Sequence, residues 1–333
     1  MSLPKFKHMT PSTLDEALGL LQKKGKKARI MAGGTDLVVS MKQRTEVPEF
    51  LVNIKKLQEL DFIRPDPDDG ITIGSLTTLE TISQSEQIKE ELNLLALAAG
   101  RVASFQIRNV GTIGGNICLN TRCWYYNQSA QWRNSIPRCF KMGGESCMVI
   151  KGSEKCNAIF LADTVPALIA LDADLKIVKQ NGERKIPVRD FYNGSGDPPN
   201  LLRPEEILTE IHVPKRPMNS FGVFFKNAPR EVVDFAMVNV AMQITFQEGN
   251  GACKDAKIAV GGVTSFPVRS VKGEEVLKGE KITEKLMDEV AEVVVKDSTP
   301  ISPIWVSPNL RRETIKALIK RGLQAALASS REP

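Results

Sequence analysis

The sequence lacks the features on which most enzyme classes depend. It has only two histidines, His8 and His212, and it has no nucleophile elbow and no zinc-hydrolase motif. Acid–base and hydrolytic chemistry therefore have no recognisable residues. No apolar run reaches the length of about 18 residues that crosses a bilayer, and residues 1–10 lack the apolar stretch of a signal peptide. We therefore expect a cytoplasmic protein that does not enter a membrane.

An excess of one charge is also missing. The 333 residues include 45 basic and 39 acidic ones, which gives a net charge of +6. The lysines between residues 23 and 27 have no aromatic neighbours, so a solvated helix face is favoured over a nucleic-acid site. Six cysteines are present, and five of them lie between residues 118 and 156. Cytoplasmic cysteines stay reduced, so this clustering indicates metal or cluster ligands before disulfides.

The first 60 residues predict a small α/β unit. A capping box and an apolar face predict a helix that ends at Gly25. A short strand at 28–31 then leads into Ala32-Gly33-Gly34-Thr35-Asp36 and a second helix, and 50–54 predict another strand. Strand, glycines and helix in this order place backbone N–H groups around an anion. An ordinary turn that needs glycine explains the same pattern equally well.

A second glycine-rich stretch follows in the middle of the chain. Residues 60–74 predict a β-hairpin, and helices are predicted from Thr77 and over 90–99. The stretch Arg108–Ile117 then contains Gly111, Gly114 and Gly115. Two glycine loops separated by about 80 residues predict two backbone surfaces that close on one extended ligand, such as a dinucleotide.

Four cysteines come next, interleaved with two of the three tryptophans and two of the three tyrosines: Cys123, Cys139, Cys147 and Cys156. Four thiolates can ligate zinc or an iron–sulfur cluster. Their spacing, C-x15-C-x7-C-x8-C, matches neither the close pairs of zinc sites nor a ferredoxin run. Zinc, a cluster and unliganded thiols therefore all stay open. Of the other cysteines, Cys118 is predicted to be a buried thiol and Cys253 a free surface thiol.

The C-terminal part predicts a compact α+β domain. Its strands are expected at 221–226, 236–246 and 257–263, and its helices at 282–296 and 310–327. A hairpin turn at 248–251 joins the last two strands. Arg230 and Asp234 are expected to form a surface or interface pair.

The two glycine loops, in this order and at this separation, resemble those of the FAD-binding subunit of the molybdenum hydroxylases. This is the medium-subunit family of xanthine dehydrogenase and carbon monoxide dehydrogenase. The resemblance covers essentially the whole chain, and it extends to Asp163–Leu168, Glu206–Pro214 and Phe224–Lys226. It implies an α+β fold with a two-subdomain FAD-binding part, at residues 1–60 and 61–217, and a C-terminal α+β domain at 218–333.

The resemblance also implies the FAD contacts. The first glycine loop would hold the pyrophosphate, and the Gly-Gly-Asn segment would approach the pyrophosphate and the flavin. No residue of this chain would be catalytic. The implied contacts are Arg29, Met31, Ala32, Gly33, Gly34, Thr35, Asp36, Leu37, Thr77, Val102, Ile107, Gly111, Thr112, Gly114, Gly115, Asn116, Asp163, Leu208 and Lys226.

The cysteine-rich segment, residues 119–158, resembles an insert in the 4-hydroxybenzoyl-CoA reductases, the branch of this family that carries one additional [4Fe–4S] cluster. The matching residues are Asn120–Cys123, Tyr126–Gln128 and Lys155-Cys156. The resemblance implies that the four cysteines hold such a cluster. Electrons would run from a donor such as ferredoxin through this cluster to FAD. They would continue to a small [2Fe–2S] subunit and a large molybdenum-cofactor subunit, in a dimer of heterotrimers that dehydroxylates 4-hydroxybenzoyl-CoA to benzoyl-CoA.

Two alternatives stay open. The chain could be the FAD subunit of an oxidative molybdenum hydroxylase, like xanthine or carbon monoxide dehydrogenase, with zinc or no metal in the cysteine-rich segment. It could also be an assembly or scaffold protein that has lost its flavin, although the intact glycines and Asn116 argue against this. Iron, sulfide and flavin analysis separates the three.

Overall fold

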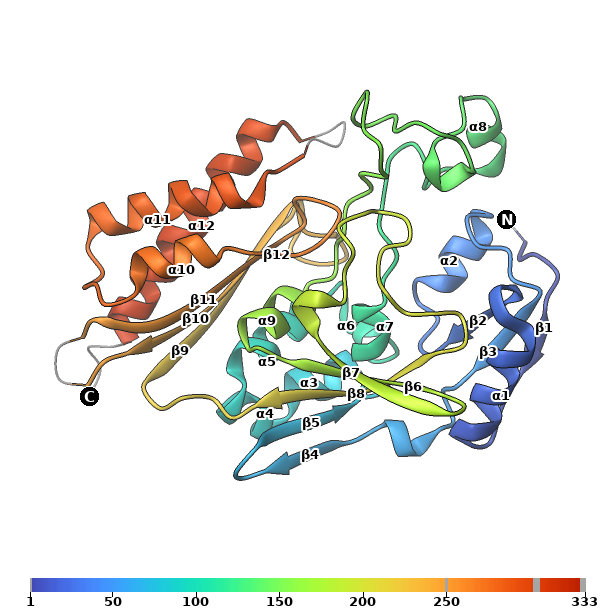
Figure 1. The fold of residues 1–333 in the computed structure, drawn as a ribbon, viewed down its shortest axis with the longest axis horizontal. Coiled ribbons are helices and arrows are strands. Elements are labelled where there is room, and N and C mark those ends of the chain that lie inside the picture. The colour runs from blue at the N-terminus through green and yellow to red at the C-terminus, as the bar shows by residue number, and fades with distance from the viewer. Residues whose placement is uncertain (1, 249–250, 302–305, 330–333) are drawn as a thin grey trace.

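Three β-sheets follow one another along the molecule (Figure 1). The computed structural model describes residues 2–248, 251–301 and 306–329. The first sheet is parallel, with the strand order β1 (Lys7–Met9), β3 (Phe50–Asn53), β2 (Ala28–Met31). Its helices are α1 (Leu14–Lys24) and α2 (Leu37–Lys42). The predicted cap of α1 is present, because Thr13 Oγ1 accepts a hydrogen bond from the Glu16 N–H.

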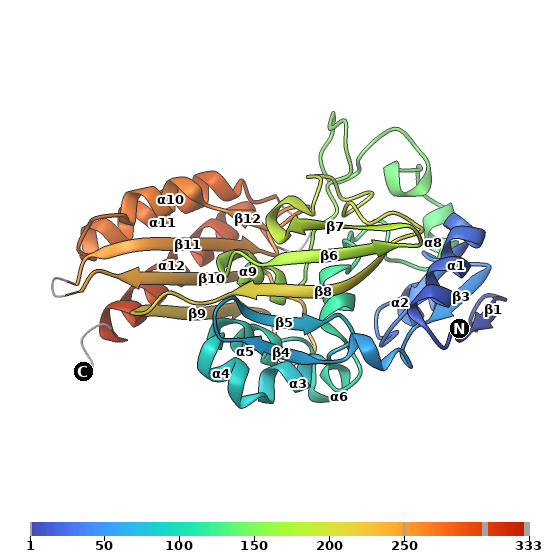
Figure 2. The same ribbon diagram turned by 60° about the horizontal axis from the view of Figure 1, so that its bottom comes forward.

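The second sheet has five antiparallel strands. Their order is β4 (Ile63–Asp66), β5 (Gly70–Gly74), β8 (Ile207–Pro214), β6 (Asp174–Lys179) and β7 (Gly182–Pro187). Short helices accompany it: α3 (Leu79–Gln84), α4 (Glu86–Glu91), α5 (Asn93–Gly100), α6 (Phe105–Arg108), α7 (Ile113–Ile117) and α9 (Thr164–Ala170). Figure 2 shows the strands of this sheet one below another, from β7 to β4, with α3 to α6 beneath them.

The third sheet is antiparallel and lies at the C-terminal end. Its order is β12 (Val268–Arg269), β11 (Cys253–Gly261), β10 (Val238–Phe246) and β9 (Ser220–Asn227). Three helices cover one of its faces: α10 (Val271–Leu277), α11 (Glu284–Ser298) and α12 (Pro308–Ser329). The predicted α+β architecture, with an FAD-type part and a C-terminal domain, is confirmed.

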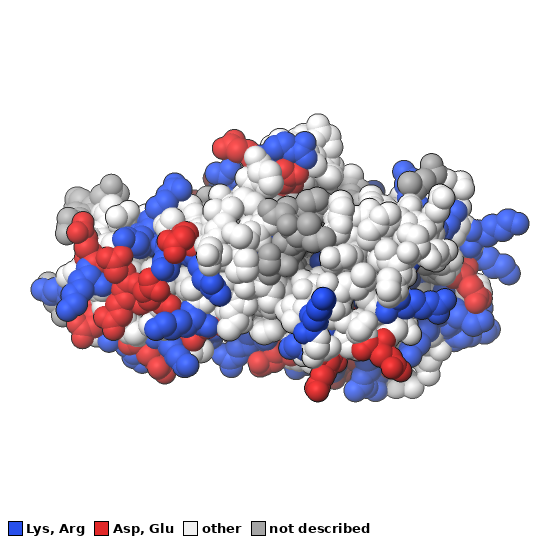
Figure 3. All heavy atoms as spheres, turned by 90° about the horizontal axis from the view of Figure 1, so that it is seen from above, with Lys and Arg blue, Asp and Glu red and all other residues white. Residues whose placement is uncertain are grey.

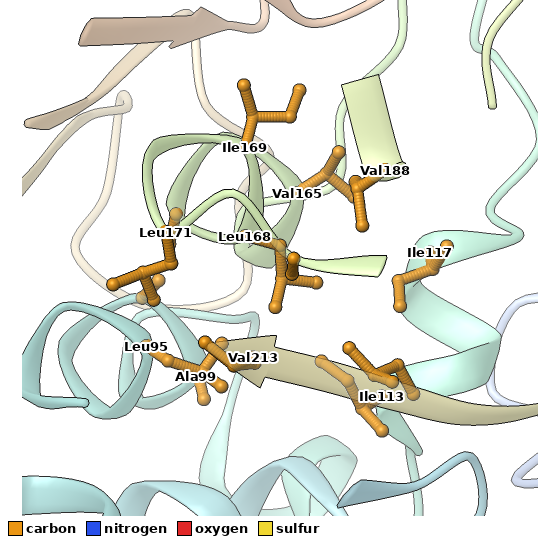
Figure 4. Close-up of a cluster of buried hydrophobic side chains, with 14 of the residues drawn as sticks. Leu95, Ala99, Ile113, Ile117, Val165, Leu168, Ile169, Leu171, Val188 and Val213 are labelled. Atoms are coloured by element: carbon orange, nitrogen blue, oxygen red, sulfur yellow. The ribbon is translucent and has the colours of Figure 1, made fainter. Parts of the chain in front are cut away.

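Helix α9 joins the second and third sheets into one core. All seven of its residues are buried, because it packs against β10 and β11 on one side and against α5 and α7 on another. Figure 4 shows Leu168 of α9 pointing toward Val213 of β8, Val165 beside Val188, and Ile169 on the opposite side of the helix. A helix that is apolar on all faces must be enclosed in this way. Each buried Leu, Ile or Val side chain here stabilises the fold by about 1.5–3 kcal/mol.

The cysteine-rich segment projects from this body as an irregular lobe above α2 (Figures 1 and 2). It contains the short helix α8 (Ala130–Asn134) and the 3₁₀ turn η3 (Phe140–Met142). The backbones of Arg122 and Ile159 exchange two hydrogen bonds, of 2.7 and 2.8 Å, at its base. The lobe is therefore anchored where it leaves the body and where it returns.

Some predicted elements differ from those observed. The helix expected over 90–99 is two helices, α4 and α5, because Leu92 leaves the helical conformation with φ −132° and ψ 45°. Strands β1, β6, β7, β8 and β12 were not predicted. The strands predicted near 221–226, 236–246 and 257–263 are present as β9, β10 and β11. Two residues of the hairpin turn predicted at 248–251 lie outside the described residues.

Charged side chains are unevenly distributed on the face that carries the lobe. Seen from above, they gather over the C-terminal helices at the left and along the edges, whereas the centre is largely uncharged (Figure 3). The predicted pair of Arg230 and Asp234 is present, with 2.7 Å between Arg230 Nη2 and Asp234 Oδ1. No helix among the described residues has the length and apolar character that a membrane span requires.

Candidate functional site

The two glycine loops lie in direct contact. A Cβ added to Gly33 would lie 2.2 Å from the carbonyl oxygen of Val110 and 3.0 Å from Cα of Gly111. A Cβ added to Gly111 would lie 3.6 Å from Thr35 Oγ1, back in the first loop. Gly34 has a φ of +72°, which glycine adopts without strain. The predicted meeting of two glycine-bearing backbones is therefore present in the structure.

The second loop is also fixed by close backbone packing. Thr112 caps α7, because its Oγ1 accepts a hydrogen bond from the Gly115 N–H at 3.1 Å. The Gly114 N–H donates to the Ser75 carbonyl at 2.9 Å, and an added Cβ would lie 2.7 Å from Ser75 Cβ. Packing alone thus requires glycine at position 114, and its contact with a cofactor stays a prediction.

Three predicted contact residues belong to one buried polar network. Asn116 Oδ1 accepts hydrogen bonds from the Thr164 hydroxyl at 2.6 Å and from the Thr164 N–H at 3.3 Å. Asp163 accepts from Lys226 Nζ at 2.6 Å and from Asn239 Nδ2 at 2.8 Å. Burial raises the pKa of Asp163, while the Lys226 ammonium lowers it. The network holds the start of α9 against α7 and against strands β9 and β10.

The other predicted FAD contacts lie in different surroundings, some in the loops and some in the core. The Thr77 hydroxyl accepts from the Phe62 N–H and donates to the Phe62 carbonyl, so both of its bonds serve the fold. Arg29 forms an ion pair with Glu46 at 2.9 Å. Ala32, Met31 and Leu37 flank or belong to the first loop, the Ile107 carbonyl accepts from the Gly111 N–H, and Val102 and Leu208 are buried in the core.

Arg122 connects the first glycine loop to the cysteine-rich segment. Its guanidinium forms an ion pair with Asp36, the last residue of that loop, and both side chains are largely buried. The guanidinium also lies 5.6 Å from the ring centre of Phe235, in the connection between β9 and β10. The backbone of Arg122 pairs with Ile159, and Cys123 follows directly. Three separate parts of the chain therefore meet at one side chain.

The lobe rests on the end of α2 through two further side chains. The Tyr126 hydroxyl donates to the Thr45 carbonyl at 3.0 Å. Arg133 donates to the carbonyls of Gln43 and Arg44, at 3.1 and 2.9 Å. The position of the lobe relative to the first glycine loop is thus fixed by backbone acceptors, which any sequence at 43–45 supplies.

The structure brings the four predicted ligand cysteines together. A small cavity inside the lobe is lined by Cys123, Cys139, Cys147 and Cys156. The remaining wall is mostly apolar or aromatic and includes Tyr125, Tyr126, Phe140, Met148 and Val149, together with Lys141. Within the described ranges, no three His, Cys, Asp or Glu side chains are arranged to hold a single metal ion.

The cavity thiols differ in their electrostatics. Burial raises the pKa of Cys156 to about 11 and also raises that of Cys123. Burial acts in the same direction on Cys147, but the hydrogen bond from Asn157 and nearby backbone hydrogen bonds outweigh it, so its pKa is lowered. Asn157 Nδ2 lies 3.4 Å from the Cys147 sulfur. Thiolate formation, which metal binding requires, is therefore more favoured at Cys147 than at Cys123 or Cys156.

The two remaining cysteines lie away from this cavity. Cys118 packs against the hydrophobic core, and burial raises the pKa of its thiol to about 12. The prediction for Cys253 was wrong, because it is fully buried. Its backbone pairs with Gly279 and Glu280, so the connection after α10 covers the start of β11 and encloses the thiol.

Reasoning from sequence missed three polar residues of this region as parts of the site: Arg122, Lys141 and Asn157. Each was visible only as a single polar residue within three positions of a ligand cysteine. No spacing rule marks such a residue, because its partners, Asp36, Asn120 and Cys147, are set by the tertiary fold.

Comparison with known proteins identifies the class. Residues 4–216 match the FAD-binding domain of molybdopterin dehydrogenases, and residues 223–326 match the C-terminal domain of the carbon monoxide dehydrogenase flavoprotein. The nicotinate dehydrogenase FAD-subunit of Eubacterium barkeri is 28% identical over 318 residues, 95% of this chain and 94% of its own. The aldehyde oxidoreductase FAD-binding subunit PaoB of Escherichia coli K12 is 30% identical over 256 residues, 73% of this chain and 76% of its own.

A solved structure shows the same fold. A chain of carbon monoxide dehydrogenase from Hydrogenophaga pseudoflava superposes with a TM-score of 0.81 at 26% identity, covering 98% of this chain and 99% of that one. Fold and glycine loops place the protein among the FAD-binding flavoproteins. The chain belongs to the family of flavoprotein subunits of the molybdenum hydroxylases, as the two matched domains show.

Proposed function

We propose that this chain carries FAD between its two glycine loops and serves as the electron-transfer subunit of a molybdenum-containing oxidoreductase complex. The contact between Gly33 and Val110 is the observation that carries the proposal. Glycines on both loops leave the backbone open to close approach by a pyrophosphate. The match of residues 4–216 to an FAD-binding domain supports the same site. The division into residues 1–60, 61–217 and 218–333 belongs to this proposal.

The chain's own residues bind and orient FAD, which supplies the electron-transfer chemistry when bound. In this proposal the FAD site has two walls, which are residues 32–36 and residues 111–116. Asn116 and Lys226 act by fixing α9, because Thr164 and Asp163 already occupy their polar groups. The other predicted contacts would stabilise the two glycine loops: Arg29, Thr77, Val102, Ile107 and Leu208.

We propose further that the four cysteines of the lobe hold a [4Fe–4S] cluster. A cube of irons and sulfides fills the space between its ligands, whereas one zinc ion brings four sulfurs to within about 2.3 Å of a single point. Thiols that line a shared cavity, as here, suit the first arrangement. The apolar and aromatic wall also limits the access of water to such a centre.

The proposed partners are a large molybdenum-cofactor subunit and a small [2Fe–2S] subunit, in a dimer of heterotrimers. A low-potential protein such as ferredoxin would be the electron donor. One candidate reaction of the complex is the reductive dehydroxylation of 4-hydroxybenzoyl-CoA. This part of the proposal depends on the likeness of the cysteine-rich segment, residues 119–158, to the insert in such reductases.

A second candidate is an oxidative molybdenum hydroxylase in which electrons leave through this subunit. The names of the relatives favour it, because nicotinate dehydrogenase and aldehyde oxidoreductase are oxidative enzymes. As evidence for the reaction of the complex, the names of these relatives count for more than the likeness of residues 119–158 to the insert in the reductases. They do not bear on what the four cysteines bind, since either direction of electron flow can use an additional centre.

Metal and flavin analysis of the isolated protein tests the proposal. We expect one FAD, with about four irons and four acid-labile sulfides per chain. Zinc without iron would contradict the cluster, and a colourless protein that does not bind added FAD would contradict the flavin site. Assays of the assembled complex then decide the direction of electron flow. The reductive assay uses 4-hydroxybenzoyl-CoA with a low-potential reductant. The oxidative assay uses an aromatic or aldehyde substrate with an electron acceptor.

A further inference from the structure

A lysine lies at the wall of the cavity formed by the four cysteines. Lys141 is in η3, between Cys139 and Cys147, and its side chain lines the cavity together with their thiols. Its ammonium donates a hydrogen bond to Asn120 Oδ1 at 2.7 Å. Asn120 lies three residues before Cys123, so the lysine reaches from one ligand loop of the lobe to the base of another.

The turn that carries Lys141 has a defined backbone. The N–H groups of Met142 and Gly144 both donate to the Cys139 carbonyl, at 2.8 and 2.9 Å. Gly143 has a φ of +77°, and a Cβ on Gly144 would lie 2.1 Å from the Arg138 carbonyl oxygen. Two glycines are thus required for a turn this tight, and the turn fixes the point from which the lysine side chain starts.

The charge of Lys141 lies at the wall of the cysteine cavity. Its side chain is half-buried, and its ammonium lies 5.2 Å from the ring centre of Tyr126. No carboxylate of the described residues forms an ion pair with it. Its side chain lines the same cavity as the four thiols. An ammonium in such a setting is stabilised by anionic sulfur at the cavity.

We propose that Lys141 tunes the redox centre held by the four cysteines by stabilising its reduced form. The inference rests on the proposed cluster. Reduction adds one electron, and hence one negative charge, to the cluster and its thiolate ligands, while no ligand or proton is exchanged. A fixed positive charge at the wall favours the more negative state and so raises the midpoint potential. Lys141 has this effect without touching iron.

The test compares Lys141→Met with Lys141→Arg and with Lys155→Met. Methionine is unbranched and only one atom shorter than lysine, and it removes the charge. Lys155 is the matched control, since it precedes Cys156, but its exposed ammonium donates to the Gly194 carbonyl at 2.8 Å. The midpoint potential of the cluster is followed by EPR during titration with dithionite, at one pH, after iron content has been measured.

We expect Lys141→Met to lower the equilibrium constant for reduction about tenfold, which is about 59 mV for one electron. Lys141→Arg and Lys155→Met should stay within about threefold of the unmodified protein. Iron lost from Lys141→Met and Lys141→Gln but retained in Lys141→Arg would support the same need for charge. A fully loaded Lys141→Met with an unchanged potential overturns the inference. Unmodified protein without iron would instead overturn the proposed cluster.

Discussion

The carboxylate of Asp36 pairs with the guanidinium of Arg122, and this pair connects the first glycine loop to the residue directly before Cys123. The two side chains are 30% and 16% exposed, so solvent screens the pair less than it screens a surface ion pair. Arg122 also lies against Phe235 and pairs through its backbone with Ile159. This ion pair therefore connects the proposed flavin loop directly to the proposed cluster lobe.

We expect Arg122→Met to weaken FAD binding and to loosen the lobe. The substitution leaves the Asp36 carboxylate without its cation, which costs about 1–3 kcal/mol for a partly buried group. The dissociation constant for FAD should rise about tenfold, equivalent to about 1.4 kcal/mol. Flavin fluorescence during titration of the apoprotein measures this change.

Arg230→Met is the matched control for Arg122→Met. Arg230 pairs with Asp234, but its side chain is 69% exposed, so solvent screens the pair and its contribution to stability is small. We expect FAD affinity and thermal midpoint to stay close to those of the unmodified protein. Equal effects of the two substitutions would show that the junction at Arg122 has no special role.

Gly33→Ala should force the two glycine loops apart. Its Cβ would meet the Val110 carbonyl oxygen at 2.2 Å, and a backbone atom cannot move aside as a side chain can. We expect at least a tenfold loss in FAD affinity and a lower melting temperature.

Gly19→Ala is the control for this change, because the nearest atom to its added Cβ is Gln180 Nε2 at 3.7 Å. Because Gly19 lies inside α1, that change should stabilise by about 0.5–1 kcal/mol. Unimpaired FAD binding by Gly33→Ala would contradict the proposed site.

Local patterns predicted much of this fold. The capping box fixed the start of α1, and alternating apolar residues gave β10 and β11. The strands at Asp174–Lys179 and Gly182–Pro187 were missed, because their exposed faces carry charged residues and the second of them is the edge strand of its sheet. The break at Leu92 was also missed, because the apolar residues at 94–99 suggested one helix that includes the residues before them.

The site was predictable where residue type alone carries the chemistry. Glycines mark close backbone approach, and cysteines mark metal ligands, so both loops and the cavity thiols were found. Residues that act through a distant partner were not found, since nothing local distinguishes Arg122 or Lys141 from any surface cation. The prediction for Cys253 failed for a different reason. Its position beside a turn indicated an exposed thiol, but α10 and the residues that follow this helix bury the side chain.

The buried pair of Asp163 and Lys226 predicts a pH-dependent stability. Lys226→Met removes the ammonium that lowers the pKa of Asp163, and burial then raises this pKa further above its ordinary value of 3.8. The folded variant therefore holds this proton at pH values where the unfolded chain has lost it. The contribution of Asp163 to the stability of the variant is fully present below about pH 4 and is lost as the pH rises through the raised pKa.

The measurement is the urea midpoint of the apoprotein between pH 4 and 8. We expect Lys226→Met to lose about 3–5 kcal/mol near neutral pH, and less at pH 4 to 5. Lys320→Met is the control, since Lys320 pairs with Asp288 on the surface; a change of under 1 kcal/mol is expected at every pH. A Lys226→Met loss that does not vary with pH would show that Asp163 is not the titrating group.

Cys139→Ser should abolish iron binding while FAD stays bound, because the cavity and the glycine loops are separate structures joined at Arg122. A serine hydroxyl is a poor ligand for a cluster that Cys thiolates hold, so iron and sulfide should fall from about four to near zero per chain. Cys118→Ala is the control: its thiol packs against the core, outside the cavity, and iron should be retained. Full iron content in Cys139→Ser, or its loss in Cys118→Ala alone, would show that the ligand set is wrongly assigned.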